Sequence, residues 1–377
     1  MPKVCVPPVI PSHYLEYRSL TSLLLSHQQQ HHHYLHCLRQ QHRLLRTTTT
    51  SFSKSATHRH PGQLTSSFLP QSQNKTAYIT TLILLSSITT AVLYQQQSSN
   101  KMGSSKLVPT NPDDVMVIRD VTPNVVTFSV PFARFGKIPV GGRGTAVKLS
   151  SGSIAVFSPV ALTPSAKAKI ASMGNDVRYL VATDFEHHIF LSQWKTAYPN
   201  AKLIGPEGLP EKRAKVTNDP QIGHEEFAVV FTKANKTTQK IDQDFDKDFE
   251  YEYVDGHANK ELVFYYKPDK VLIQADLIFN LPATEQYSRV PEAEKPKTGV
   301  FAQFFIGLNS TEGEAKGMKR FIWYVVSKAD RPSFNESVKR ISGWGFDSIV
   351  PCHGETIVGG GKAVFEKVFE WHLTGKK

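Results

Sequence analysis

The chain has 377 residues and a formal net charge of +11, and its hydrophobic content of 40% is enough for a sizeable core. The charge is concentrated at the N-terminus: residues 1–110 contain ten lysines and arginines but one acid, Glu16, which leaves 34 basic and 32 acidic residues elsewhere. This near-neutral remainder gives no support for nucleic-acid binding, and we expect no nucleic-acid partner. The wide spacing of Cys5, Cys37 and Cys352 excludes a disulfide framework and Cys-x-x-Cys metal knuckles from the folded part.

Residues 1–76 have a low-complexity composition dominated by Ser, Thr, Gln and His, which is typical of disorder. The same segment is rich in Arg and Ser and nearly free of acids, and this combination is typical of a mitochondrial transit peptide. The composition therefore predicts either a disordered basic leader or a transit peptide, and both alternatives stay open.

Residues 77–94 are uncharged and predict a single-pass transmembrane helix. At a rise of ~1.5 Å per residue the segment spans about 27 Å, near the low end for a bilayer. We expect it to anchor the protein in a membrane, with a mitochondrial membrane favoured over another endomembrane. A linker is predicted over residues 95–112, and a translation start at Met102 would remove both leader and anchor.

A folded domain is predicted over residues 113–377, where short β-branched runs alternate with turns. Its first strands are predicted to be antiparallel, at residues 115–119, 125–130, 145–149 and 153–157. The sequence Gly-Gly-Arg-Gly at residues 141–144 predicts a turn, because a phosphate-binding loop needs a following helix and a Lys-Ser/Thr ending.

An α/β alternation follows this first part. Thr163 and Pro164 predict the start of a helix that ends at Gly174. A helix containing Trp194 is predicted after the next strand. The remaining strands are predicted over residues 179–182, 201–204, 228–231, 251–254, 261–266, 271–275 and 348–350.

Less regular segments separate the later elements. The alternating carboxylates of residues 242–250 predict a solvated turn, and Ser333-x-x-Glu336 is a capping box that predicts a helix to about Gly343. A closing helix is predicted over residues 362–372. Residues 280–320 are predicted to be an insertion over the sheet edge, and this insertion contains Phe301, Phe304 and Phe305.

Histidines and an aspartate follow the ends of four predicted strands. His187 and His188 follow the strand at residues 179–182, and His257, Asp276 and His353 each follow a later strand. Because strand ends at one edge of a sheet lie close together, we expect these side chains to meet. Imidazoles and carboxylates are ligands for Zn²⁺, Fe and Mn²⁺, so these five residues are candidate metal ligands. Asp276 is placed to bridge two ions, and metal-activated water is the nucleophile that such a site provides.

Structural roles are the alternative for the same residues. A histidine in a tight glycine turn, such as His257, also caps backbone groups, and Asp276 at a strand end also caps a turn. Adjacent residues on a strand face opposite ways, so one of His187 and His188 is a candidate for the core. His224 and His372 lie in no motif and are expected at the surface.

The domain resembles the metallo-β-lactamase superfamily. The sequence DGHANKELVFYYKPDKVLIQADLIF is similar to the Gly-His loop, strand, turn, strand and terminal aspartate of that family, and IVPCHGE is similar to its last histidine loop, with Cys352 where glycine is commoner. The order and spacing fit over residues 115–370. The resemblance implies an α/β fold, a four-layered αββα sandwich with metals at one edge. GGRGTAVKLSSGSIAVFSPVAL and the His-His pair are most similar to a poorly characterised branch of the superfamily.

The chain departs from the HxHxDH motif of this superfamily. One register places His187 and His188 in the Asp-His positions, with Thr183 and Phe185 where histidines are usual. The second register places Asp184, Glu186 and His187 in the last three positions and Ala182 in the first. Either register leaves one metal site with most of its ligands and depletes the other, which implies a single Zn or Fe ion rather than two.

The sequence therefore predicts a membrane-anchored metallohydrolase-like protein. A metal held by His187, His188, Asp276 and His353, with His257 nearby, would activate water for attack on an ester, thioester or amide. Asp276 and His257 are the predicted catalytic residues, and the partner is a small-molecule or acyl substrate under a lid formed by residues 280–320. The alternatives are a catalytically inactive binding module of the same fold and an iron-dependent redox protein.

Overall fold

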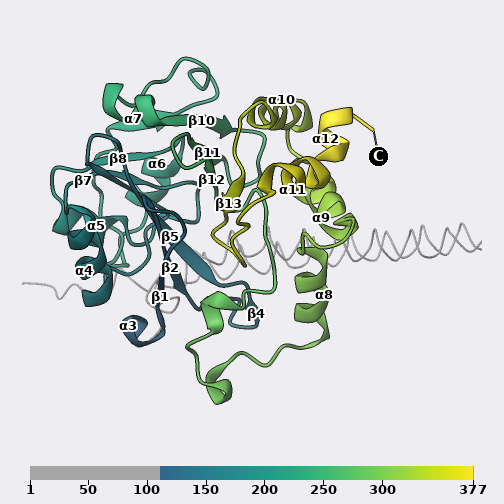
Figure 1. Cartoon of the computed structure of the whole chain (residues 1–377), viewed down its shortest axis with the longest axis horizontal. Coiled ribbons are helices and arrows are strands. Elements are labelled where there is room, and N and C mark those ends of the chain that lie inside the picture. Colours follow the sequence, from purple (N-terminus) through teal and green to yellow (C-terminus); the bar gives the residue numbers. More distant parts are fainter. Residues whose placement is uncertain (1–110, 377) are drawn as a thin grey trace, which may run out of the picture. The chain divides into compact units, whose positions relative to one another are not determined.

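The structure is a computed structural model and describes residues 111–376. The first of its two large sheets contains seven strands in the order β1-β2-β5-β6-β7-β8-β9. The strands are β1 (Val117–Asp120), β2 (Val125–Val130), β5 (Gly142–Lys148), β6 (Ile154–Phe157), β7 (Val177–Val181), β8 (Lys202–Pro206) and β9 (Val229–Phe231). The pairs up to β6 are antiparallel, and the pairs from β6 to β9 are parallel (Figure 1).

The second sheet has the order β10-β11-β12-β13. Its strands are β10 (Phe249–Val254), β11 (Glu261–Tyr266), β12 (Val271–Ile273) and β13 (Ser348–Val350). The last two strands are parallel, and the other pairs are antiparallel. A small hairpin of β3 (Ala133–Arg134) and β4 (Ile138–Pro139) projects from the first sheet between β2 and β5.

The two sheets pack face to face because successive residues of each strand point to opposite faces. Tyr179 and Val181 of β7 and Phe264 of β11 lie in the core between the sheets, where the rings of Phe157 and Phe264 are 4.9 Å apart. Leu180, the intervening residue of β7, points to the opposite side of its sheet. Burial of both faces explains why these strands read as continuous apolar runs.

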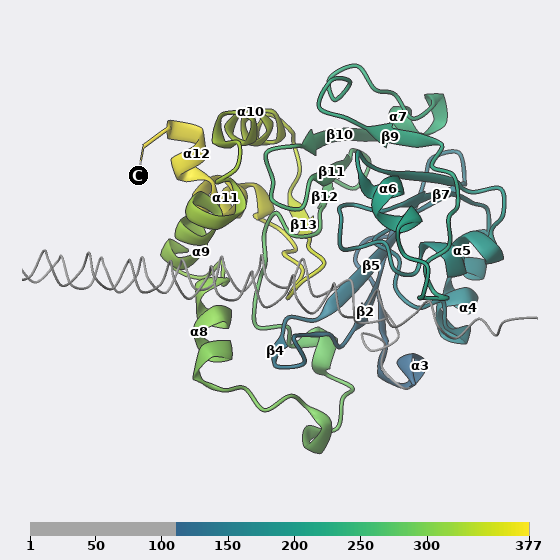
Figure 2. The same cartoon turned by 180° about the vertical axis from the view of Figure 1, so that it is seen from behind.

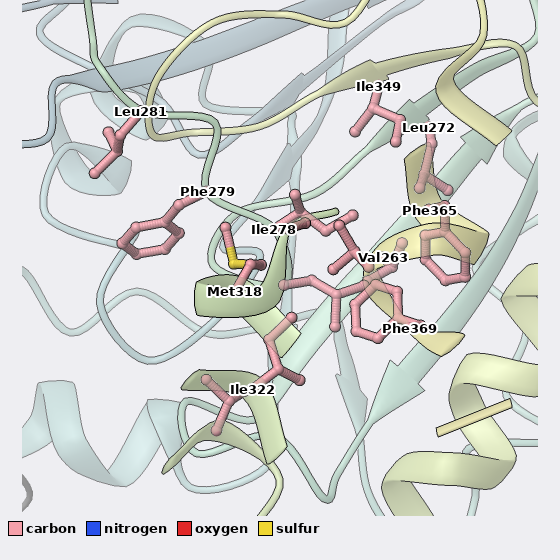
Figure 3. Packing of buried hydrophobic residues seen from close by; sticks show 14 of the residues in the cluster. Val263, Leu272, Ile278, Phe279, Leu281, Met318, Ile322, Ile349, Phe365 and Phe369 are labelled. Carbon is pink, nitrogen blue, oxygen red and sulfur yellow. The ribbon is translucent and has the colours of Figure 1, made fainter. Parts of the chain in front are cut away.

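Helices cover the outer face of each sheet, which completes four layers in the order αββα (Figures 1 and 2). The first sheet packs against Ile170 of α4 (Pro164–Met173) and Trp194 of α5 (Leu191–Ala197). The second sheet packs against helices from the C-terminal part, and Figure 3 shows Val263 and Leu272 of this sheet among Met318, Phe365 and Phe369. The predicted four-layered sandwich is thereby confirmed.

The helices of this C-terminal layer begin after two short 3₁₀ turns, Glu285–Tyr287 and Glu292–Glu294. They are α8 (Val300–Leu308), α9 (Lys316–Phe321) with the π-helix Ile322–Val326, α10 (Arg331–Ser342), α11 (Gly361–Val368) and α12 (Glu370–Thr374). Three short helices lie elsewhere, α3 (Pro112–Val115), α6 (Leu209–Ala214) and α7 (Gln243–Asp248). Among residues 111–376 no helix is long and apolar enough to cross a membrane. The leader, the transmembrane helix predicted at residues 77–94 and nearly all of the linker lie outside the described residues.

Most predicted elements are present, and local chemistry explains both ends of α4. Thr163 caps α4 by accepting a hydrogen bond from the Ala166 amide, and Gly174 ends that helix, as predicted. The closing helix is present but divided into α11 and α12.

Three local predictions are wrong. Gly142–Gly144 belong to β5 rather than to a turn. Glycine is needed in this strand because an added Cβ at Gly144 would lie 3.0 Å from the Ser158 carbonyl oxygen. Residues 243–248 form α7, because Asp242 caps that helix and buried Phe245 holds it against the core. The cap of α10 is Asp330 rather than Ser333.

His372, expected at the surface, is buried on α12. Its ring lies 4.9 Å from the rings of both Trp323 and Phe334, and its Nδ1 is 2.7 Å from Asn335 Oδ1. Burial, together with the nearby Arg331 guanidinium, lowers the pKa of His372 to about 4. His224 is exposed, so its substitution serves as the control for a substitution of the buried His372.

Acid should therefore destabilise the fold through His372. The unfolded chain binds a proton at this residue near pH 6.5 whereas the folded chain binds it near pH 4. The contribution to stability is complete above about pH 6.5 and falls as the pH decreases towards 4, by at most about 3 kcal/mol. Urea unfolding across this range should give a shallower pH dependence for His372→Gln than for the wild type or His224→Gln. Equal slopes in all three proteins would contradict the assignment.

Candidate metal centre

His187, Asp276 and His353 meet at one edge of the sandwich. His187 lies in the turn after β7, Asp276 follows β12, and His353 follows β13, so both sheets contribute. One ligand atom from each residue lies within 4.8 Å of the other two. His187 Nε2 is 3.2 Å from His353 Nε2, and His353 Nε2 is 3.1 Å from Asp276 Oδ1.

Hydrogen bonds at the opposite ring nitrogens orient the two imidazoles. His353 Nδ1 donates to the Gly141 carbonyl oxygen at 2.6 Å, and His187 Nδ1 donates to Asp184 Oδ1 at 2.9 Å. In the neutral rings the Nε2 atoms then carry the lone pairs, and these lone pairs face each other. Such an arrangement requires a shared proton or a cation between the two nitrogens.

The spacing fits a metal ion. Ligand atoms at ~2.0–2.1 Å from a tetrahedral ion lie about 3.3 Å from one another, close to the two separations around His353 Nε2. Asp276 Oδ1 is buried and has no hydrogen-bond partner, which is also the state of an oxygen placed for an ion. A backbone carbonyl behind one imidazole and a carboxylate behind the other are typical supports of metal-ligating histidines.

The charged groups of the centre stabilise one another. Burial opposes ionisation of Asp276, but His353 and His187 hold the pKa of that carboxyl well below its usual range. Burial likewise opposes protonation of His187, but the Asp184 carboxylate raises the pKa of His187 well above its usual value. The centre therefore favours ionised carboxylates facing a positive charge.

His257 lies beside this centre but is not part of the three-residue cluster. Its Nδ1 accepts the Asn259 amide N–H at 3.1 Å, so in the neutral ring Nε2 carries the proton. This Nε2 is buried without a hydrogen-bond partner and lies 3.6 Å from Glu261 Oε2. Burial lowers the pKa of His257 and keeps the ring neutral, although Asp276 and Asp184 oppose that shift. This tautomer suits a proton donor rather than a metal ligand, in contrast to the predicted ligand role.

His188 is turned away from the centre, which corrects its predicted role as a ligand. Arg213 Nη1 lies 3.2 Å from His188 Nδ1 and donates to the His188 carbonyl oxygen at 2.8 Å. Burial lowers the pKa of His188 well below its usual value, and the cations Lys212 and Arg213 lower it further. His188 is therefore a neutral packing residue beneath α6.

The second motif register describes the structure. His187 occupies the position of the last motif histidine, and Asp184 stands where the motif has its second histidine. Glu186, in the aspartate position, pairs with Lys212 Nζ at 3.2 Å and is partly exposed, so it does not join the centre. Asp184 at this position is thus a carboxylate that orients His187.

Two supporting residues were missed in the sequence. Glu261 is fully buried and accepts the amide N–H groups of Ala275 and Asp276 at 2.7 and 2.9 Å, which holds the backbone of Asp276 in place. Asn259 donates to Asp276 Oδ2 at 2.6 Å. A glutamate at the start of the apolar strand Glu261–Tyr266 was the available sign of such a role.

Aromatic side chains border the His353 side of the centre. The Phe279 ring centroid lies 4.7 Å from that of His353, and the Phe132 ring stacks on His353 at 6.3 Å. Phe305 of α8 packs against Phe279 at 6.4 Å. The insertion at residues 280–320 therefore reaches the centre through Phe305 and Phe279.

Matches to known proteins were found among solved structures and not among family models or curated sequences. No family model and no curated protein matches the chain. Similar solved structures include a metallo-beta-lactamase from Pontibacter korlensis, with 14% identity, 68% of this chain and 98% of that chain covered, and a TM-score of 0.42. A metal-soaked flavodiiron core from Synechocystis sp. PCC6803 has 11% identity, covers 68% and 60%, and has a TM-score of 0.47. The rubredoxin oxygen:oxidoreductase of Desulfovibrio gigas has 14% identity, covers 68% and 61%, and has a TM-score of 0.45.

The layers and the candidate metal centre define the class of fold. Two sheets covered by helices, with a His-Asp-His cluster where strands of both sheets end, define a metallo-β-lactamase-like fold with a candidate metal site.

The metal content of purified variants should distinguish the ligand His353 from His188, which is not a ligand. His353→Ala should remove a bound transition metal, whereas His188→Gln should retain it, because His188 contacts Arg213 instead. Asp184→Asn should weaken metal affinity by about 10–100-fold, since it supports His187 without being in the cluster. Elemental analysis of the purified proteins after dialysis measures all three. Equal metal loss in His188→Gln and His353→Ala would contradict this ligand set.

Proposed function

We propose that the protein is a metal-dependent hydrolase that attacks an ester, thioester or amide, anchored in a membrane through residues 77–94. The observation that carries the proposal is the convergence of His187 Nε2, His353 Nε2 and Asp276 Oδ1, with both imidazoles fixed by acceptors at Nδ1. This donor set suits Zn²⁺ or Fe²⁺. Bound there, either ion would lower the pKa of water and polarise a carbonyl group.

The chain's own residues would perform the remaining tasks. Asn259 and Glu261 hold Asp276 in position, one at its carboxylate and one at its backbone. His257 carries a proton on a buried Nε2 with no hydrogen-bond partner, so it is the candidate donor to a leaving group. Phe279 and Phe132 limit water on the His353 side and favour a substrate with an apolar group.

An iron-dependent redox function is the second candidate. Two histidines and one carboxylate form the ligand set typical of non-haem iron, and His187, His353 and Asp276 are such a set. The same three residues in a chain that retains no metal would instead support an inactive binding module. Metal identity and turnover therefore discriminate among the three functions.

Hydrolysis should depend on metal and on the cluster. With Zn²⁺ or Fe²⁺ restored, the wild type should hydrolyse generic acyl esters or thioesters, and chelation should abolish the activity. His187→Ala should lower kcat/KM on the order of 100-fold or more, because it removes a ligand. His224→Gln, at an exposed residue, is the matched control and should retain full activity.

Three outcomes would redirect the assignment. Hydrolysis that persists after chelation would overturn the hydrolase proposal. Bound iron without hydrolysis would favour the redox function. Less than about one-tenth equivalent of any transition metal, with no loss of stability on chelation, would favour the inactive module.

A further inference from the structure

Exposed large apolar side chains gather on two neighbouring elements. Among the described residues, four of the five such side chains are Phe135 at the tip of the β3–β4 hairpin and Val300, Phe301 and Phe304 on α8. The strand β4 contacts α8, so the hairpin and the helix lie side by side. These four side chains are called the apolar face below.

The packing of one side of α8 against the domain leaves the opposite side exposed. Val300, Phe301 and Phe304 share one side of the helix, since positions three and four residues apart are neighbours. Ala302 is buried, and Phe305 packs against Phe279 and Phe321, with ring centroids 6.4 and 6.0 Å apart. The inner side is thereby fixed, and Phe301 and Phe304 remain half-exposed at 50% and 51%.

The hairpin tip displays an aromatic ring at a conformational cost. Phe135 has φ +58°, a left-handed conformation that a bulky side chain rarely adopts and that glycine adopts freely. Its side chain is nonetheless exposed rather than packed into the core. Phe135 and Gly136 both have positive φ and form the tight turn of the hairpin, and this turn leaves the phenylalanine ring exposed beside α8.

Unpaired lysines border the apolar face. Lys137 follows Phe135 by two residues, and Lys297 precedes α8. Both are exposed, and neither forms an ion pair within residues 111–376. Lys295 in the same segment is paired with Glu292, whereas Lys137 and Lys297 are two exposed cations next to the apolar face.

The sequence restricts the surface that this face would meet. The predicted transmembrane helix ends at residue 94, and the structure begins at residue 111. The intervening 16 residues reach at most about 55 Å when fully extended. Such a tether would keep the domain at the bilayer surface, and the apolar face decides which side of the domain turns towards it.

We propose that the apolar face docks on the surface of a lipid bilayer that contains anionic lipid. Phe135, Phe301 and Phe304 enter the boundary between headgroups and acyl chains, where aromatic rings are favoured. Lys137 and Lys297 lie against the anionic headgroups. This docking is independent of the metal centre and goes beyond the proposed hydrolysis.

A bilayer fits the charge of this face better than a second copy of the chain does. In a two-fold symmetric dimer the same face occurs on both sides of the interface, so Lys137 and Lys297 would meet lysines of the other copy. An anionic surface instead attracts both residues and leaves the rings free to insert.

Depth-dependent quenching tests the proposal on the full chain. Cys5→Ser and Cys37→Ser leave the buried Cys352 as the remaining cysteine. A fluorophore at Gln303→Cys, exposed on α8, is compared with one at Gln243→Cys, exposed on α7 at the opposite end of the domain (Figures 1 and 2). The protein is reconstituted in phosphatidylcholine–phosphatidylglycerol vesicles that carry doxyl-labelled lipid.

We expect several-fold stronger quenching of the label at position 303 than of the label at position 243. Phe301→Ser with Phe304→Ser should bring the two signals to the same level, and Lys137→Glu with Lys297→Glu should weaken the position-303 signal. Near-UV circular dichroism of each variant confirms the fold, and metal content and hydrolysis are measured on the same samples.

Equal quenching at both positions in the unmodified face would overturn the proposal, as would quenching that survives the double serine variant. Protection of the position-303 label without vesicles, accompanied by a dimer in light scattering, would assign the face to a second copy. Because these variants lie outside the metal centre, loss of docking with intact hydrolysis separates this proposal from the proposed function.

Discussion

The edge of the sandwich that contains the candidate metal centre depends on the 3.2 Å approach of His187 Nε2 to His353 Nε2. Two nitrogen lone pairs at this distance repel each other unless a positive charge lies between them. The chain nevertheless fixes both rings in this orientation, through the Gly141 carbonyl group behind one and the Asp184 carboxylate behind the other. A domain that uses two hydrogen bonds to hold this arrangement is organised for a positive charge between the rings, either a shared proton or a cation.

The loop after β7 contains a carboxylate that supports one of the candidate ligands. Asp184 Oδ1 accepts the amide N–H groups of Glu186 and His187 at 2.7 and 2.9 Å as well as the His187 ring N–H. A single carboxylate oxygen thus fixes both the backbone of the turn and the orientation of the His187 ring. This arrangement explains how the loop orders one ligand of the centre.

Features that depend on neighbours in the sequence were the predictable ones. The cap at Thr163 and the strand ends that carry Asp276 and His353 follow from local patterns, and the structure places them as expected. The choice between His187 and His188 did not follow, because Arg213, 25 residues further along the chain, binds His188. The partners of Glu261 were equally hidden, since they are the amide groups of Ala275 and Asp276 in the segment after β12. Sequence patterns thus locate the site, whereas tertiary contacts decide which residues complete it.

The buried charges of the centre link its function to its stability. Asp184, Glu261 and Asp276 are carboxyl groups with almost no solvent exposure, while His188 and His257 are held neutral by burial. Burial together with the charges of Asp184 and Asp276 raises the pKa of Glu261 well above its usual value. Desolvated carboxylates without a compensating positive charge destabilise a fold. A bound cation would offset this repulsion, so its binding free energy would contribute to folding. The same charges therefore account for a site that keeps its geometry and for a fold that benefits when the site is filled.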